Sequence, residues 1–136
     1  MSNELVTADN VSRELLKSIF DAAYMTTSLD SDGDVVVKEQ CNCIVLPDKE
    51  KRRIWLLTQY SFKPTATDTE KLMCVNKINM DYLIVRAVVV KNILRFSYDI
   101  VLDGDGITPK SLVLLIKRFC NIAPSAVQDY GQDIVE

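Results

Sequence analysis

The sequence predicts an α+β fold in which an antiparallel sheet carries helices on one face. Strand patterns follow one another directly along much of the chain, which is typical of antiparallel rather than parallel sheets. Amphipathic helix patterns stand at both ends of the chain and once between strands. The chain has 136 residues, 48% of them hydrophobic, enough to bury one core. We therefore expect a single domain over residues 1–136, with the order α-β-β-β-β-α-β-β-α.

The first helix is expected over residues 8–24. Thr7 is its candidate N-cap, and Asp9 places negative charge in the first turn. Polar side chains fall opposite the apolar ones, so the helix is predicted to lie on the surface with one buried stripe. The stripe residues recur at helical spacing: Val11, Leu15, Leu16, Ile19, Phe20 and Ala23.

Four strands are expected to follow, with short turns between them. The turn after the first strand is rich in Asp, and Gly33 can take the positive φ that such a turn needs. In the fourth strand, Ile54 and Leu56 point to one face of the sheet, whereas Trp55 and Leu57 point to the other. The four strands are predicted over residues 24–29, 35–40, 41–46 and 54–62.

Thr67 and Glu70 form a capping-box pattern, which predicts that a short helix begins there. The chain then gives two more strands, over residues 83–90 and 93–102. The second strand alternates apolar and polar residues, so one of its faces is buried. The first is apolar on both faces apart from Arg86, which predicts a position near the centre of the sheet.

The last helix is expected to begin after a turn at residues 103–106. Thr108 is its N-cap, and Pro109 occupies the first helical position, where the missing proline N–H costs little. Pro124 lacks the N–H that an interior helical position would use. We therefore expect the helix to break at Pro124 and a short helical piece to start at Ser125.

The composition excludes several classes of function. The formal charge is −3 and the pI is about 5.0, which disfavours nonspecific binding to nucleic acid. The absence of histidine removes the usual Ser–His and Cys–His pairs, so we expect no enzyme and no cofactor. No apolar run approaches the roughly 18 residues of a membrane span, and the N-terminus lacks a signal-peptide pattern. We expect a cytoplasmic protein whose four cysteines stay reduced.

Two side-chain groups are candidate metal ligands. Asp30, Asp32 and Asp34 have the spacing of a calcium loop, but Val35 and Cys41 stand where an EF-hand needs its glycine and its bidentate glutamate. The cysteines form no paired C-x-x-C motif, so we interpret all of them as inert core residues. A small-ligand or metal-ion sensor that uses the aspartates or the cysteines is the alternative hypothesis.

The second face of the predicted sheet is the candidate interaction surface. If helices cover only one face, then Trp55, Leu57, Val88 and Val90 on the other face need another cover. Contiguous exposed apolar patches mark protein interaction sites. We therefore expect self-association to a homodimer or binding of a protein partner that the sequence does not name.

Four polar residues form a candidate structural motif. Asn76 and Asn79 share a helix face, where their amides can bond backbone groups at the helix end and at the start of the next strand. Arg86 is the only charge in its strand, and it is expected either to extend its guanidinium to solvent or to pair with an acid such as Asp99 or Asp103.

These short motifs together resemble the YbjN family of proposed bacterial sensory transduction regulators. The resemblance rests on Asn76-Lys77-Ile78-Asn79, on Arg86 within a strand, and on Asp103 to Thr108 before the last helix. With the first helix, Tyr24 and the Asp32-Gly33-Asp34 turn, it covers residues 8–122. It implies a fold similar to type III secretion chaperones, which are small, often dimeric and act by binding protein. It supplies no catalytic residue, so we expect a non-enzymatic regulatory or chaperone-like protein.

Overall fold

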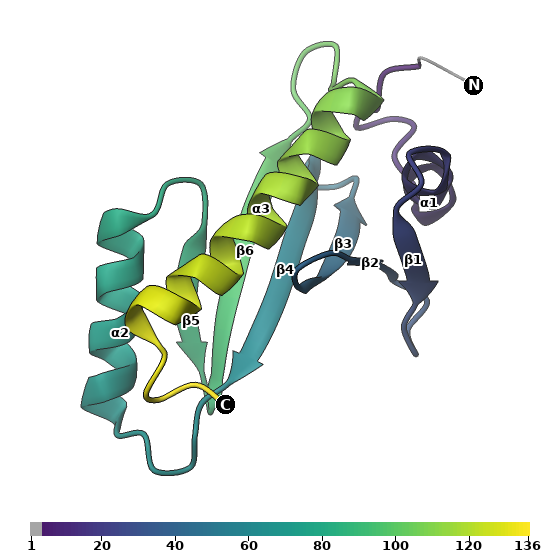
Figure 1. Ribbon diagram of the computed structural model, residues 1–136. Helices are drawn as coiled ribbons and strands as arrows, with labels where there is room; N and C mark the ends of the chain where they lie inside the picture. The colour runs from purple at the N-terminus through teal and green to yellow at the C-terminus, as the bar shows by residue number, and fades with distance from the viewer. Residues whose placement is uncertain (1–3) are drawn as a thin grey trace.

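The computed structural model describes residues 4–136, so the first three residues of the predicted domain lie outside the described part. Three helices and six strands follow one another in the predicted order (Figure 1). They are α1 (Arg13–Ala22), β1 (Thr26–Leu29), β2 (Val35–Lys38), β3 (Asn42–Asp48), β4 (Arg53–Ser61), α2 (Asp68–Asp81), β5 (Arg86–Val90), β6 (Ile93–Val101) and α3 (Pro109–Tyr130).

The strands form one antiparallel sheet in the order β1-β2-β3-β4-β6-β5. Strands β4 and β6 pair along their whole length, from Arg53 opposite Val101 to Ser61 opposite Ile93. Hairpin connections extend the sheet from β4 back to β1, and β5 flanks β6 at the other edge. The chain therefore builds an α+β fold with helices on one face, as the sequence predicts.

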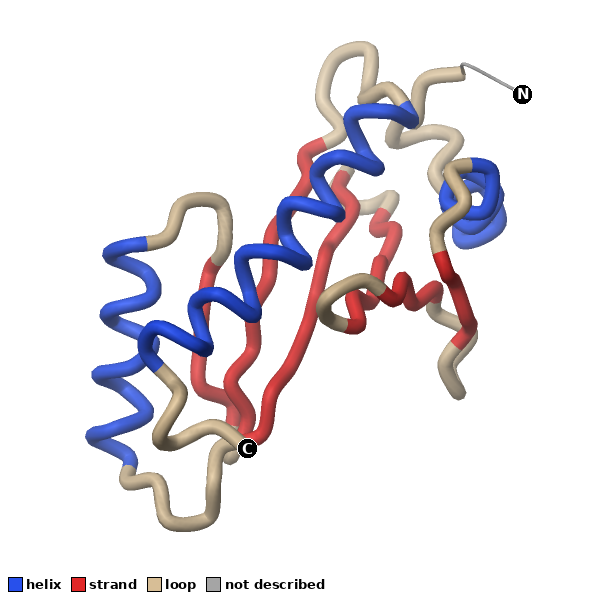
Figure 2. Tube along the Cα trace, viewed as in Figure 1, coloured by secondary structure: helices blue, strands red, loops and turns tan. Residues whose placement is uncertain are grey.

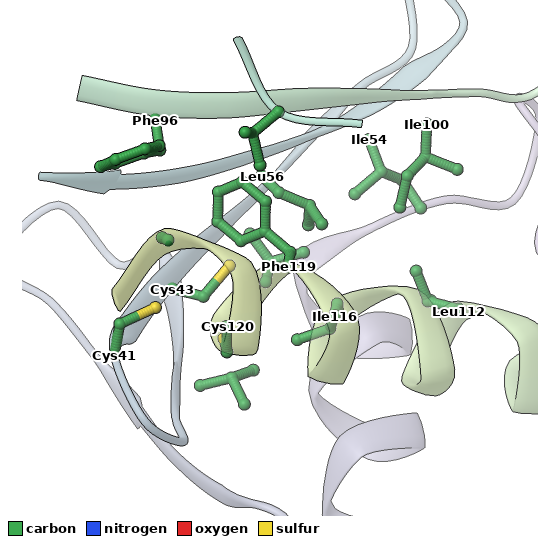
Figure 3. Packing of buried hydrophobic residues seen from close by; sticks show 14 of the residues in the cluster. Cys41, Cys43, Ile54, Leu56, Phe96, Ile100, Leu112, Ile116, Phe119 and Cys120 are labelled. Atoms are coloured by element: carbon green, nitrogen blue, oxygen red, sulfur yellow. The ribbon is translucent and has the colours of Figure 1, made fainter. Parts of the chain in front are cut away.

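The apolar core lies between this sheet and the helices. Figures 1 and 2 show α3 running obliquely over the long central strands, with α2 beside β5 and α1 beside β1. All three helices contribute buried residues to one continuous cluster, part of which Figure 3 shows. On α3 the buried residues are Leu112, Ile116, Phe119, Cys120, Ala123 and Ala126.

The position of β5 corrects one sequence prediction. The segment 83–90 reads as a central strand, yet β5 begins only at Arg86 and lies at the sheet edge. Ala87 and Val89 pack into the core on the side where α2 lies, whereas Val88 and Val90 point to the opposite face. Before the strand, Leu83 is 83% exposed, and the β-branched Ile84 takes a φ of +81°, which such residues rarely adopt.

The first helix is shorter than predicted. It begins at Arg13, and its N-cap is Ser12, whose side chain accepts a hydrogen bond from the Leu15 N–H. The preceding segment is held elsewhere, because Val6 exchanges two backbone hydrogen bonds with Ile107, of 2.8 and 2.9 Å. Thr7, the predicted cap, instead accepts a bond from the Asn10 N–H within a local turn.

The last helix corrects the prediction of a break at Pro124. Helix α3 continues through Pro124 to Tyr130. Ala123 and Ala126 on either side are fully buried, so packing against the sheet holds a helix that the missing N–H alone would weaken. After Gly131 the chain turns back, and the Glu136 N–H bonds the Ser61 carbonyl at the end of β4. Residues 124–136 therefore complete the domain.

Candidate functional site: the sheet face without helices

In the part of the chain that the structure describes, one face of the sheet carries no helix, and we call it the open face. Direct cross-strand neighbours share a face, so the register defines its members. Leu57 stands between Ile44 and Ser97, and Trp55 stands between Leu46 and Asp99. Beyond Ser97 the same row ends at Arg86 of β5. The open face therefore has an apolar area, formed by Val36, Ile44, Leu46, Trp55 and Leu57 on β2, β3 and β4.

Trp55 is the main aromatic side chain of this area. It is half-buried, and the guanidinium carbon of Arg53 lies 5.0 Å from the centre of its ring. Arg53 is held in turn by Asp48 at 3.3 Å and by Asp99 at 2.9 Å. Within residues 4–136, the buried indole Nε1 of Trp55 has no hydrogen-bond acceptor. A buried donor without an acceptor is unfavourable by roughly 1–3 kcal/mol.

The carboxylate of Asp48 reinforces this arrangement. The Lys51 backbone N–H donates to it at 3.1 Å, and this bond, with Arg53 beside it, lowers the pKa of Asp48 below its ordinary value. Asp48 therefore remains ionised, and it fixes Arg53 next to the indole ring. The arginine–aromatic pair at this site is positioned before any partner binds.

The four predicted surface residues share the open face but do not form one patch. Leu57 is only 5% exposed, so it forms a floor rather than a projecting contact. Val88 and Val90 are half-buried on β5, and Arg95 of β6 stands directly beside Val88, between it and β4. The apolar area around Trp55 is therefore separated from the smaller valine area by charged side chains.

Sequence reasoning missed three members of the apolar area, Val36, Ile44 and Leu46. Their alternation within short strands was a usable signal, but only the register shows that they adjoin Leu57 and Trp55. A one-residue slip would have moved them to the core face. The pairing of separate strands, rather than any pattern within one, assembles the site.

Asn79 closes part of the β5 edge. Its side-chain carbonyl accepts the Ala87 N–H at 2.8 Å, and its side-chain amide donates to the Ala87 carbonyl at 3.0 Å. The side chain thereby imitates a neighbouring strand and blocks these edge groups from another chain. Asn76 is exposed, and its amide contacts the Met80 sulfur at 3.7 Å, so the two asparagines have different roles.

Among the described residues Arg86 forms no ion pair, so of its two expected arrangements the structure has the one in which the side chain extends to solvent. Asp99 pairs with Arg53, and Asp103 lies nearest Arg52, with 3.9 Å between Arg52 Nε and Asp103 Oδ1. Arg86 is exposed at the open-face end of β5. The strand register places it next to Ser97, two residues before Asp99 on the same strand, but the Asp99 carboxylate pairs with Arg53 from the other neighbouring strand.

The three turn aspartates do come together. Asp30, Asp32 and Asp34 each offer a carboxylate oxygen, and these oxygens lie within 4.8 Å of one another. Asp30 already accepts the backbone N–H groups of Asp32 and Asp34, both at 2.9 Å. Asp34 also pairs with Arg13 at 2.8 Å. These bonds account for the aspartates as parts of the turn and of its contact with α1.

The cysteines are all free and buried, but three of them gather in one place. Cys41 and Cys43 of the β2–β3 hairpin meet Cys120 of α3 (Figure 3). The adjacent Cys120 and burial raise the pKa of the Cys41 thiol far above its ordinary value. Cys41 lowers the pKa of Cys120, but Cys43 and burial outweigh it and raise that pKa to about 12. No sequence pattern indicates this cluster, because Cys120 is remote from the hairpin along the chain.

Fold and surface together define a class of protein: a small α+β domain whose antiparallel sheet is covered by helices on one face and carries an apolar, arginine-flanked area on the other. The chain belongs to the YbjN family, described as "Putative bacterial sensory transduction regulator", whose model matches residues 12–136. The match includes the C-terminal residues that the sequence resemblance over residues 8–122 left out.

Two solved structures share this fold. One is "Crystal structure of YbjN, a putative transcription regulator from E. coli", with a TM-score of 0.76 and 12% identity over 98% of this chain and 99% of that chain. The other is an uncharacterized protein from Methanothermobacter thermautotrophicus, with a TM-score of 0.63 and 14% identity over 90% of this chain and 99% of that chain. No curated protein matches the sequence. Within the described residues, no helix has the length and apolar character to cross a membrane.

Proposed function

We propose that this protein is a non-enzymatic, cytoplasmic regulatory or chaperone-like module that acts by binding protein, and that it forms a homodimer through the open face around Trp55. The observation that carries this proposal is the state of Trp55. A large aromatic side chain is half-buried on a sheet face without helices, and its indole N–H lacks an acceptor among the described residues. Protein interfaces concentrate their binding energy in Trp, Tyr and Arg residues.

The surroundings of Trp55 have the composition of an interface. Ile44 and Leu46 supply an apolar centre, and Arg53 with its two carboxylates supplies a polar rim. In a twofold-symmetric dimer the same patch of both subunits forms the interface. Each Trp55 would therefore pack against the apolar area of the partner subunit. The mechanism is burial of apolar side chains, and Arg53 with its carboxylates orients the contact.

The test is the solution mass from light scattering, for wild type and for Trp55→Asp. We expect wild type at twice 15.4 kDa and the variant at 15.4 kDa with an unchanged circular dichroism spectrum. The matched control is Leu114→Asp, which places the same charge at an exposed apolar position of α3, and we expect it to stay dimeric. A monomeric wild type at micromolar concentration, or a dimer that survives Trp55→Asp, would contradict the proposed interface.

A metal-ion sensor is the second candidate function, and the closeness of the Asp30, Asp32 and Asp34 oxygens favours it. A ligand that binds only the native state raises apparent stability. A calcium-dependent increase in melting temperature that Asp32→Asn abolishes would support a sensor. The same melting temperature with and without calcium would remove this candidate.

A further inference from the structure

Two thiols of the β2–β3 hairpin lie near a third, which is distant in the sequence and belongs to the buried side of α3. Cys41 lies in the turn between β2 and β3, Cys43 lies on β3, and Cys120 lies on the buried side of α3. Figure 3 shows the three residues in one part of the core. Cys120 is the common neighbour, because its thiol acts on that of Cys41 and is itself acted on by Cys43.

We propose that Cys41 and Cys120 form a reversible dithiol–disulfide pair, which oxidation by a hydroperoxide converts to a bond between the β2–β3 turn and α3. Cys120 interacts with both other thiols, so it is the natural resolving partner. The bond would join two elements that otherwise meet only through core packing. This site is independent of the proposed function and of the open face.

Accessibility selects Cys41 as the thiol that is oxidised first. Cys41 retains 9% of its surface, whereas Cys43 and Cys120 are fully buried. It also follows two exposed turn residues, Glu39 and Gln40, so a small oxidant approaches it from solvent. Cys43 stands behind it on the strand, where its thiol lies 3.7 Å from the Ile44 carbonyl.

The reaction balances with the peroxide as the only co-reactant. The Cys41 sulfur attacks one oxygen of hydrogen peroxide, the O–O bond breaks, and Cys41 becomes a sulfenic acid while the other oxygen leaves as water with the thiol proton. The Cys120 sulfur then attacks the Cys41 sulfur, the S–O bond breaks, and the hydroxyl leaves as a second water with the Cys120 proton. Two electrons pass from the two thiols to the peroxide. Burial keeps both thiols protonated, so this oxidation is slow and follows sustained exposure.

The geometry favours a bond between two thiols over a three-thiol metal centre. A single ion needs all its ligand atoms near one point. Among the described residues, only Asp30, Asp32 and Asp34 place three such atoms within 4.8 Å of one another. The cysteines thus meet in pairs through Cys120, and a pair is what a disulfide requires.

The test treats the full chain with hydrogen peroxide, denatures it, alkylates the remaining thiols and measures the intact mass. We expect the number of alkylated thiols to fall from four to two, and peptide mapping to join the Cys41 and Cys120 peptides. Reduction should restore all four. Cys41→Ser and Cys120→Ser should each abolish the cross-link. Cys74→Ser is the matched control, because Cys74 is buried in α2 outside the cluster, and it should keep the cross-link.

Several results would overturn the proposal. Four alkylated thiols after oxidation, or a Cys41 sulfinic acid with Cys120 still free, would show that the pair does not form. A wild-type cross-link between Cys43 and Cys120 would contradict the role of Cys41. Circular dichroism checks that each serine variant is folded. If Cys120→Ser does not fold, Cys41→Ser, which changes only a turn residue, decides the question alone.

Discussion

Leu56 and Leu57 are consecutive residues of β4 whose side chains point to opposite faces of the sheet, so they allow a direct comparison of the two faces. Leu56 is fully buried on the face that the helices cover. Leu57 is 5% exposed on the open face, between Ile44 and Ser97. Leu56 is covered by the helix layer, whereas Leu57 is covered by neighbouring side chains of its own sheet. Burial by lateral neighbours therefore leaves an apolar face that a second protein can still approach.

The largest expected effect on stability is a difference between substitutions of these two leucines. Leu56→Ala should lower the free energy of unfolding by about 2–5 kcal/mol, because the helices prevent the cavity from collapsing. Leu57→Ala should cost less than half as much, because neighbouring side chains and water can fill the space. Urea unfolding of both variants measures the difference. Equal losses would mean that the open face is packed as a core, and would count against its role as an interface.

A smaller effect is expected at the β5 edge. Asn79→Ala removes both hydrogen bonds to Ala87 and should lower the free energy of unfolding by about 1–3 kcal/mol. It also frees a strand edge, so aggregation on heating should increase. Asn76→Ala is the matched control on the same helix and should change little. Similar losses for both variants would show that Asn79 does not act through the edge.

The capping box of α2 should contribute about 1 kcal/mol. Thr67 accepts the Glu70 N–H at 3.1 Å, and Glu70 accepts the Thr67 N–H at 2.9 Å. Thr67→Ala should therefore lower the free energy of unfolding by about that amount, measured by urea unfolding. Thr69→Ala, at an exposed position two residues later, should leave the free energy of unfolding nearly unchanged. An unchanged Thr67→Ala variant would mean that packing against β5 alone holds the start of α2.

The smallest expected effect is a pH dependence at the ends of α2 and α3. The Tyr82 hydroxyl bonds Asp129, which raises the pKa of Tyr82 to about 12. Asp81 in the same way raises the pKa of Tyr130. A raised folded-state pKa stabilises the protein below the unfolded-state value near 10, and this contribution is lost as the pH rises toward about 12.

Unfolding measured across this pH range should therefore show a steeper loss of stability for wild type than for Tyr82→Phe. The difference is small because the pair is solvent-exposed and screened. Tyr24→Phe, at a residue that is 97% exposed, is the control. Identical pH profiles for wild type and Tyr82→Phe would show that the pair does not couple the two helices.

Some features of the candidate site could be predicted from the sequence, and others could not. Alternation in β4 separated Trp55 and Leu57 from the core residues Ile54 and Leu56, because successive side chains in a strand point to opposite faces. The neighbours of Trp55 did not follow, since Leu46 and Asp99 reach it only through the pairing of separate strands. The ion pairs of Arg53 were missed for the same reason.

The sequence by itself determined the order of helices and strands, the capping of α2 and α3, and the alternation that gives the sheet two faces, because these depend on residues close together in the chain. Tertiary structure alone decided that β5 is an edge strand, that α3 passes through Pro124, and that Cys120 meets Cys41 and Cys43. Each of these depends on contacts between distant segments. Such contacts can override a local preference of a few kcal/mol, and a pattern of neighbours along the chain does not record them.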